Sequence, residues 1–347
     1  MSLILTRAQN AQGVYPNGFD WPAHRQQNYG YIAAFQKSNL LTPEAKALLT
    51  SGNNWNAPAL QLPVMTKGNA TVTQTAQTCA FSTGSSTSSF VSVVFIQGFF
   101  DTQIYHNESI GNKISQDQDF MNQFKGGEEN MADIIELAMY NAMDAARSTT
   151  YNSNFIGLGK RYGALVGDAI QVSNTLAPTF FYDGKSIMFA DNFGRTGNNV
   201  IGDAQLASYF DFYNAQGSAN QQNLNPQFAG YDFSTSNSTV TTGTAVSTGF
   251  IFAPNMLDMV SRVSPVFTNG IPTKDITFGT HRSELLGIDL GWKKQISCVS
   301  SDAVIGTTPP KNALSTMEQM TFSYDVAIII ANDPSTNGGI KKFDINA

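Results

Sequence analysis

Charged residues, cysteines and long apolar runs are all scarce in this sequence. Only 13% of its 347 residues are charged, against roughly 25% in typical globular domains. The two cysteines, Cys79 and Cys298, lie far apart, which fits neither a disulfide framework nor a zinc site. No apolar run approaches the roughly 18 residues that a transmembrane helix needs. These absences argue against a membrane protein and against a disulfide- or zinc-stabilised domain.

Clusters of basic residues are missing as well. Twenty Lys and Arg residues stand against 26 Asp and Glu, and the formal net charge is −6. The basic runs go no further than the pairs Lys293-Lys294 and Lys341-Lys342. Nucleic-acid binding by counterion release needs clustered cations, so we expect no sequence-directed or condensing contact with nucleic acid. Residues 1–7 have no basic stretch before their apolar residues, which makes them a poor signal peptide.

The motifs of common catalytic sites are absent or incomplete. A Gly-Lys-Ser at 184–186 lacks the P-loop glycine five positions earlier, where Thr179 stands. The glycines between 157 and 163 have the wrong spacing for a dinucleotide site and follow a helical pattern. The three histidines form no zinc-binding pair, and no Gly-x-Ser-x-Gly occurs. We therefore expect no enzyme activity, no catalytic residues, no bound metal and no cofactor.

Neutral polar side chains take the place of charge. Hydrophobic residues make up 41% of the chain and aromatic residues 11%, so the chain as a whole is not disordered. Its length allows one or two hydrophobic cores. Asn, Gln, Ser and Thr pair with one another without desolvating an ion. Such a surface suits extensive packed contacts with other molecules.

Residues 1–62 have the pattern of an arm. Phe19 and Trp21 are bulky apolar residues in a segment that has little else to pack, and we expect them to contact a neighbouring subunit. Helical material is predicted from 30 to 49. Thr42 followed by Pro43 is typical of an N-cap and a first helical position.

Residues 63–106 predict a long β-hairpin. Within residues 69–81, Thr recurs at every second position from 71 to 75. Residues 90–105 are rich in Val, Phe and Ile, and 82–89 form a polar Ser/Thr/Gly tip. An isolated two-stranded ribbon is marginally stable in water. We therefore expect a neighbouring molecule to supply the missing packing. The candidate contact residues here are Thr83, Ser86 and Ser88.

The strongest helical pattern covers residues 117–151. Acids at 117 and 119 open it, Gly126-Gly127 is expected to interrupt it, and acids at 128 and 129 restart it. The expected outcome is a helix of about five turns. One face is predicted to pack on the strand that ends in residues 328–330. Its members recur at helical spacing and are Met131, Ile134, Ile135, Ala138 and Ala142.

Beyond residue 155 the patterns are short and mixed. The expected elements are a Gly-rich connection at 157–167, a hairpin at 179–190 around Asp183-Gly184, a helix at 203–214, a strand at 250–252, a helix at 256–262, and strands at 276–290, 292–299 and 320–331. Residues 217–248 are small and polar, which indicates a loop or a ribbon ordered by a partner. Gln221 and Asn223 are its candidate inter-subunit contacts.

The order of these features resembles a known family. A polar arm and a Ser/Thr-tipped hairpin are followed by Phe99 and the run Ile104-Tyr105-His106-Asn107, then by residues 119–124 and a long helix ending near 151. A mixed domain and an apolar strand close the chain. This layout looks like that of the major capsid proteins of tailed bacteriophages with the HK97 fold.

The resemblance implies an α+β fold with an N-terminal arm, an extended β-hairpin loop, a long spine helix, and peripheral and axial domains. The implied ranges are 1–62 for the arm, 63–106 for the hairpin loop, 107–165 for the peripheral domain with the spine helix, 166–285 for the axial domain, and 286–347 for the return to the peripheral domain. On this layout residues 217–248 lie near the centre of a capsomer. We expect their conformation to differ between hexamers and pentamers.

The function that the resemblance implies is structural. The chain would assemble with itself into hexamers and pentamers of an icosahedral head that encloses double-stranded DNA. Further implied partners are portal, scaffolding and decoration proteins, with packaged DNA contacted non-specifically and no membrane contact. The implied location is the virion, after assembly in the host cytoplasm.

Three other classes remain open on sequence grounds. A double jelly roll, another shell architecture, needs strand patterns every 8 to 12 residues throughout, and the helix predicted at 128–151 argues against it. A secreted adhesin or carbohydrate-binding module fits the Ser/Thr/Asn content but needs an export signal. An enzyme is the third alternative. The particle size of the purified protein distinguishes a shell from the other classes.

Overall fold

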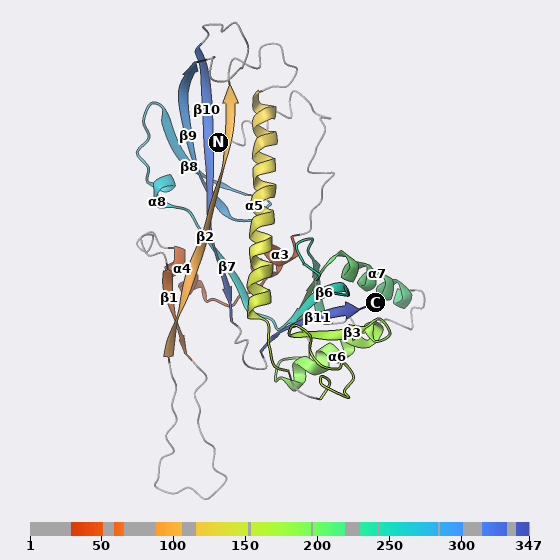
Figure 1. The fold of residues 1–347 in the computed structure, drawn as a ribbon. Coiled ribbons are helices and arrows are strands. Elements are labelled where there is room, and N and C mark those ends of the chain that lie inside the picture. The colour runs from red at the N-terminus through yellow and green to blue at the C-terminus, as the bar shows by residue number, and fades with distance from the viewer. Residues whose placement is uncertain are drawn as a thin grey trace, which may run out of the picture.

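The computed structural model describes residues 29–50, 59–65, 88–105, 116–151, 154–195, 197–218, 230–241, 243–283, 285–300, 314–331 and 338–346. These residues form two β-sheets and a long helix that runs beside the first sheet (Figure 1). The six helices are α3 (Gly30–Lys37), α4 (Pro43–Thr50), α5 (Gln116–Ala146), α6 (Ala177–Ala190), α7 (Ala204–Ser218) and α8 (Pro265–Thr268) within the described ranges.

The first sheet has six strands in the order β1-β2-β10-β9-β8, and β7 also pairs with β10. Its strands are β1 (Ala59–Met65), β2 (Ser88–Tyr105), β7 (Leu257–Arg262), β8 (Ile276–Arg282), β9 (Asp289–Ser300) and β10 (Leu314–Ile330). All its pairings are antiparallel. β10 is the central strand, because it pairs with β2 over 317–327, with β9 over 314–323 and with β7 over 325–330.

The second sheet has five strands in the order β3-β11-β6-β4-β5. They are β3 (Ala169–Ser173), β4 (Asn198–Gly202), β5 (Tyr231–Thr235), β6 (Ala245–Phe252) and β11 (Ile340–Asn346). β11 runs parallel to β3 and antiparallel to β6, and β4 runs parallel to β5. A core centred on Phe180, Phe181 and Phe343 joins α6 to this sheet. Sheet membership therefore crosses the boundary expected at 285/286, because β7 and β8 lie in the first sheet and β11 lies in the second.

The first sheet is packed on both faces near one end. Phe322, Tyr324 and Val326 of β10 belong to clusters that contain residues of α5. The alternate residues Ala327 and Ile329 pack with Leu49 of α4. Successive strand residues point to opposite faces, so the run of apolar residues at the end of β10 reflects burial on both sides. This agrees with the strand expected at 320–331.

Helix α5 is continuous over 31 residues and about 45 Å long. The interruption expected at Gly126-Gly127 is wrong. A Cβ on Gly127 would lie 2.3 Å from the ring of Phe100, so this glycine lets the helix approach β2 closely. The predicted apolar face is partly wrong as well. Met131 and Ile135 are buried, but Ile134 is 56% exposed, and the buried face continues instead through Ala132, Met139 and Met143.

Two predicted elements have the wrong type. Residues 179–190 belong to helix α6 instead of a hairpin, and 257–262 form strand β7 instead of a helix. Gly184 lies inside α6, where a Cβ would meet Ile251 at 2.8 Å, so this glycine serves packing and not a turn. Asn255 has a φ of 59° and lies in the turn that precedes β7. β7 then pairs along β10.

The remaining expectations are met in part. α7 and the strands at 250–252, 276–282, 289–300 and 314–330 are present. Within 217–248, β5 and the start of β6 replace the expected loop. The first strand of the hairpin is described at 59–65, and the predicted range 69–81 lies outside the described residues. A 31-residue helix packed against an open sheet does not occur in a double jelly roll, so this fold is not that architecture.

Candidate functional site

β1 and the first half of β2 form a two-stranded ribbon at one end of the first sheet (Figure 1). The register runs from Ala59 opposite Val94 to Met65 opposite Ser88. Among the described residues, β1 pairs with β2 alone. Pro63 fits this edge position because proline lacks the N–H that a central strand donates. The ribbon therefore leaves one edge of β1 open in the described part of the chain.

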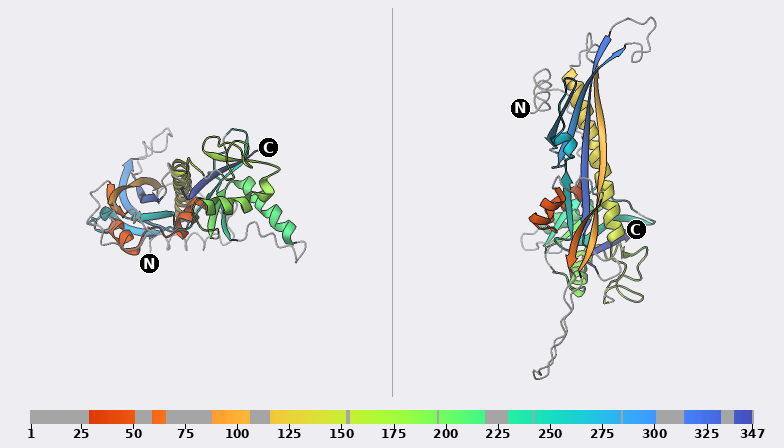
Figure 2. Two further views of the ribbon diagram at one scale, coloured as in Figure 1. Left: turned by 90° about the horizontal axis from the view of Figure 1, so that it is seen from below. Right: turned by 90° about the vertical axis from the view of Figure 1, so that its left-hand side faces the viewer.

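The second half of β2 belongs to the body of the molecule. Residues 95–105 pair with β10 in continuous register, from Phe95 opposite Ala327 to Tyr105 opposite Met317. Figure 2 shows β2 and β10 running together along the sheet beside α5. The expectation of an unsupported hairpin from 63 to 105 is therefore wrong for 95–105. The ribbon and the sheet share one continuous strand.

Apolar and charged contacts fix the base of the ribbon. Val93 and Phe95 are buried with Leu49 of α4. The guanidinium of Arg262 lies 3.7 Å from the centre of the Phe95 ring, and its Nε lies 3.4 Å from Asp325 Oδ2. Burial raises the pKa of Asp325, and the positive charge of Arg262 opposes that shift. Val94, which lies between the buried Val93 and Phe95 and points to the opposite face, is exposed.

A side-chain amide pairs with the other edge of β2. Gln123 of α5 accepts a hydrogen bond from Gln103 N at 2.9 Å and donates one to Gln103 O at 3.0 Å. The amide thus satisfies the backbone donor and acceptor that a neighbouring strand would otherwise pair with. Phe100, Phe124 and Phe322 pack beneath it between helix and sheet. These contacts hold β2 against α5.

Helix α3 is held by a carboxylate from α5. Its N-cap residue makes no side-chain cap. Instead, the buried Glu136 accepts hydrogen bonds from Tyr31 N and Ile32 N, each at 2.9 Å. Burial raises the pKa of Glu136, although these hydrogen bonds and one from Ser236 lower it. α3 is therefore fixed where the two sheets meet.

Two adjacent lysines of β11 join the second sheet to α5 and α6. Lys342 Nζ lies 2.8 Å from Asp144 Oδ1, near the end of α5. Lys341 Nζ lies 2.6 Å from Asp191 Oδ2, at the end of α6, and both side chains are almost fully buried. Burial lowers the pKa of Lys341, and Asp191 opposes that shift. One strand thus anchors both helices.

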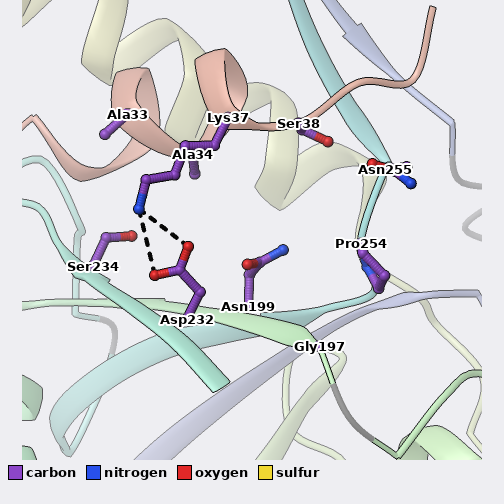
Figure 3. A pocket seen from close by; sticks show the side chains of 10 residues that line it. All are labelled: Ala33, Ala34, Lys37, Ser38, Gly197, Asn199, Asp232, Ser234, Pro254 and Asn255. Carbon is purple, nitrogen blue, oxygen red and sulfur yellow. Dashed lines mark hydrogen bonds and ion pairs between the residues drawn. The ribbon is translucent and has the colours of Figure 1, made fainter. Parts of the chain in front are cut away.

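A polar cleft of about 160 Å³ lies below α3 at the junction of the sheets (Figure 3). Lys37 and Asp232 form an ion pair of 3.1 Å at its rim. Asn199 points into the cleft from β4 (Figure 3). The lining residues are Ala33, Ala34, Lys37 and Ser38 of the α3 segment, Gly197 and Asn199 at β4, Asp232 and Ser234 of β5, and Pro254 and Asn255 before β7.

Most of the contact residues predicted from sequence lie outside the described residues. They are Phe19, Trp21, Thr83, Ser86, Gln221 and Asn223. Ser88 is described through its backbone, which pairs with Met65 in the ribbon. The sequence did not predict that the apolar side chains of Val94, Phe99, Ile134 and Leu137 are exposed. Along β2 the buried side chains are the odd-numbered ones before residue 96 and the even-numbered ones after it. This change depends on which helix covers each face of the sheet.

The described residues hold no group of three or more His, Cys, Asp or Glu side chains arranged for a metal. The Gly-Lys-Ser of 184–186 lies within α6 and not in a phosphate-binding loop. His281 packs against the ring of Phe124 at 5.4 Å. None of the helices searched in the described part is both long and apolar enough to cross a bilayer.

No protein-family model matches the chain, and no curated protein matches it in sequence. Among solved structures, a chain from Mycobacterium phage Che8 is similar with a TM-score of 0.51 and 12% identity, over 88% of this chain and 89% of that chain. Mycobacterium phage Adephagia follows at 0.47 and 13%, over 98% of both chains. A capsid structure of the cyanophage P-SCSP1u follows at 0.43 and 11%, over 84% of both.

The likeness to the Che8 chain concerns the fold, and it extends over 88% of this chain. The fold class expected from sequence, an α+β fold of the HK97 capsid type, is confirmed. The resemblance drawn from the order of the sequence features is therefore confirmed at the level of the fold.

Proposed function

We propose that the chain is a major capsid protein, a structural subunit that assembles with itself into hexamers and pentamers of an icosahedral phage head around double-stranded DNA. The observation that carries this proposal is the fold shared with a phage protein over nearly nine-tenths of both chains. The chemistry of the described residues agrees with it, because their polar contacts serve packing between elements. The proposed role is structural and not enzymatic.

The ribbon supports self-assembly. A two-stranded ribbon has too few strands to be stable alone, and the described part of β1 has one open edge. Strand edges pair readily with other chains. The ribbon is therefore the element of this fold best suited to reach a neighbouring copy.

The proposed domains follow the sheets. The first sheet with α5 is assigned as the peripheral domain, and the second sheet with α6 and α7 as the axial domain. The proposed location is the virion, with assembly in the host cytoplasm. Proposed partners besides other copies are portal, scaffolding and decoration proteins, and packaged DNA contacted without sequence preference.

A shortened ribbon tests the proposal. Met65 and Ser88 are direct partners in the register, so residues 66–87 can be replaced by Asn-Gly, which forms a two-residue hairpin turn. Residues 95–105 must stay, because they pair with β10. The purified wild type is expected to form shells or capsomer rings in light scattering and negative-stain microscopy. The shortened variant is expected to keep its circular dichroism spectrum and to remain unassembled.

The outcomes separate the two parts of the proposal. A wild-type protein that stays a monodisperse monomer overturns the capsid function. Normal shells from the shortened variant overturn only the proposed role of the ribbon and leave the capsid function standing. A control variant replaces the exposed Lys160 by Ser in the Gly-rich connection, which lies outside both sheets, and is expected to assemble normally.

A further inference from the structure

The cleft below α3 is lined by several neutral polar side chains. In the described part of the chain, the side chains of Asn199, Ser234 and Asn255 make no hydrogen bond with another residue. Asn199 points into the space, and Asn255 stands beside it (Figure 3). Amides and hydroxyls that converge on one concavity bind water or a group that both donates and accepts hydrogen bonds.

The size of the cleft limits its occupant. Pockets for small organic ligands measure about 300–1,000 Å³ and are mostly apolar. This cleft has a volume of about 160 Å³ and contributes few apolar side chains. That volume has room for several water molecules. A single polar side chain fits, whereas a cofactor does not.

The charge of the cleft also limits its occupant. Lys37 and Asp232 are the charged lining residues, and they neutralise each other at the rim. Their side chains are 65% and 55% exposed, and exposed ion pairs contribute little to stability. The rim can therefore open at small cost, and a neutral guest leaves no charge desolvated.

We propose that this cleft binds a side-chain carboxamide from a second copy of this chain. The inference rests on the proposed function, in which copies of the chain contact one another. A carboxamide has two N–H donors and a carbonyl acceptor, which complements the amides of Asn199 and Asn255. Gln221 and Asn223 belong to the amide-rich segment that is predicted from sequence to make inter-subunit contacts, and one of them is the expected guest.

Photo-crosslinking tests the inference. A benzophenone amino acid replaces Lys37, at the rim, which removes an exposed ion pair and leaves the interior of the cleft intact. ¹⁴N-labelled protein carrying this residue is co-assembled with ¹⁵N-labelled wild type, and crosslinked peptides are identified by mass spectrometry. The expected product joins residue 37 of the light chain to a heavy peptide containing residues 221 and 223. The matched control places the same residue at Arg282, whose exposed ion pair with Asp289 resembles that of Lys37.

Substitutions in the cleft and in the guest segment test whether the guest is a side-chain carboxamide. Asn199→Leu is expected to lower the yield of the mixed-isotope product at least fivefold, as is the double variant Gln221→Leu/Asn223→Leu, while Asn130→Leu on the exposed side of α5 leaves it unchanged. Particles without the mixed-isotope product, or with crosslinks within one chain alone, overturn this inference. Failure of the wild type to form particles overturns the proposed function and this inference with it.

Discussion

Glu136 Oε1 accepts a hydrogen bond from Tyr31 N, 105 residues away in sequence, at 2.9 Å. The other carboxylate oxygen accepts from the next backbone N–H, that of Ile32. Glu136 thereby replaces the N-cap that α3 lacks. The start of α3 depends on a residue of α5, so the two helices form one structural unit where the sheets meet.

Removing this carboxylate is expected to destabilise the fold. Glu136→Ala leaves two buried N–H groups without acceptors, and each costs about 1–3 kcal/mol. Glu136→Gln keeps one acceptor and is expected to lose roughly half as much. Urea unfolding of the unassembled subunit measures both free energies. Equal stability of Glu136→Ala and wild type would contradict the capping role.

The same group predicts a pH dependence. Burial raises the pKa of Glu136 above its ordinary value of 4.5, so the folded state holds the proton to a higher pH than the unfolded state. The unfolding free energy of wild type relative to Glu136→Gln is therefore largest below pH 4.5. It is expected to fall as the pH rises through the pKa of the folded state. A difference that grows with pH would show that the hydrogen bonds outweigh desolvation.

The two adjacent glycines of α5 are expected to respond in opposite directions to alanine. Gly126 has open space around it, so Gly126→Ala gains about 0.5–1 kcal/mol from helix propensity. Gly127→Ala places a methyl group 2.3 Å from the Phe100 ring, and such overpacking costs about 1–3 kcal/mol. Thermal midpoints of the two variants test the pair. Stabilisation by both substitutions would refute the close contact with β2.

Two neighbouring isoleucines of α5 provide a second pair. Ile135 is 2% exposed and Ile134 is 56% exposed. Ile135→Ala is expected to cost about 2–5 kcal/mol through the cavity it leaves, and Ile134→Ala to change stability by less than about 0.5 kcal/mol. Chemical denaturation measures both. Large losses from both substitutions would restore the helix face predicted from sequence, which contains both isoleucines.

Part of the segment 217–248, which is predicted to differ in conformation between hexamers and pentamers, is fixed by strand pairing. β5 pairs with β4 through five residues, from Tyr231 to Thr235, and α3 packs against it, with Gly30 close to the Thr235 carbonyl. We expect these residues to have the same backbone in every copy of a cryo-EM reconstruction. For the rest of 217–248 the difference between copies stays a prediction, and residues 219–229 lie outside the described residues. Superimposable backbones throughout 217–248 would contradict the idea of plasticity.

The sequence was sufficient for features that depend on neighbouring residues. The side chain of Thr42 caps α4 by accepting from Ala45 N at 3.3 Å, and Asp203 caps α7 by accepting from Leu206 N at 2.8 Å. The apolar spacing of α5 gave its location. Each of these signals lies within a few positions along the chain.

The errors share a different cause. Asp183-Gly184 has the composition of a turn, but Gly184 is needed for contact with Ile251, which lies far away in sequence. The helix predicted at 256–262 is strand β7 instead, because β10 offers this segment a partner. The polar cleft gave no sequence signal, because its lining comes from four separate segments. These features depend on tertiary contacts.

The strand shared by ribbon and sheet has a mechanical consequence. β2 carries the ribbon at 88–94 and pairs with β10 from Phe95 to Tyr105. Hydrogen bonds between antiparallel strands lie across the strand direction, so tension applied along the ribbon acts on the bonds between Phe95 and Tyr105 in shear. Those bonds resist together instead of opening one after another like a zipper. A pull on the ribbon would therefore be distributed along the full length of the β2–β10 pairing.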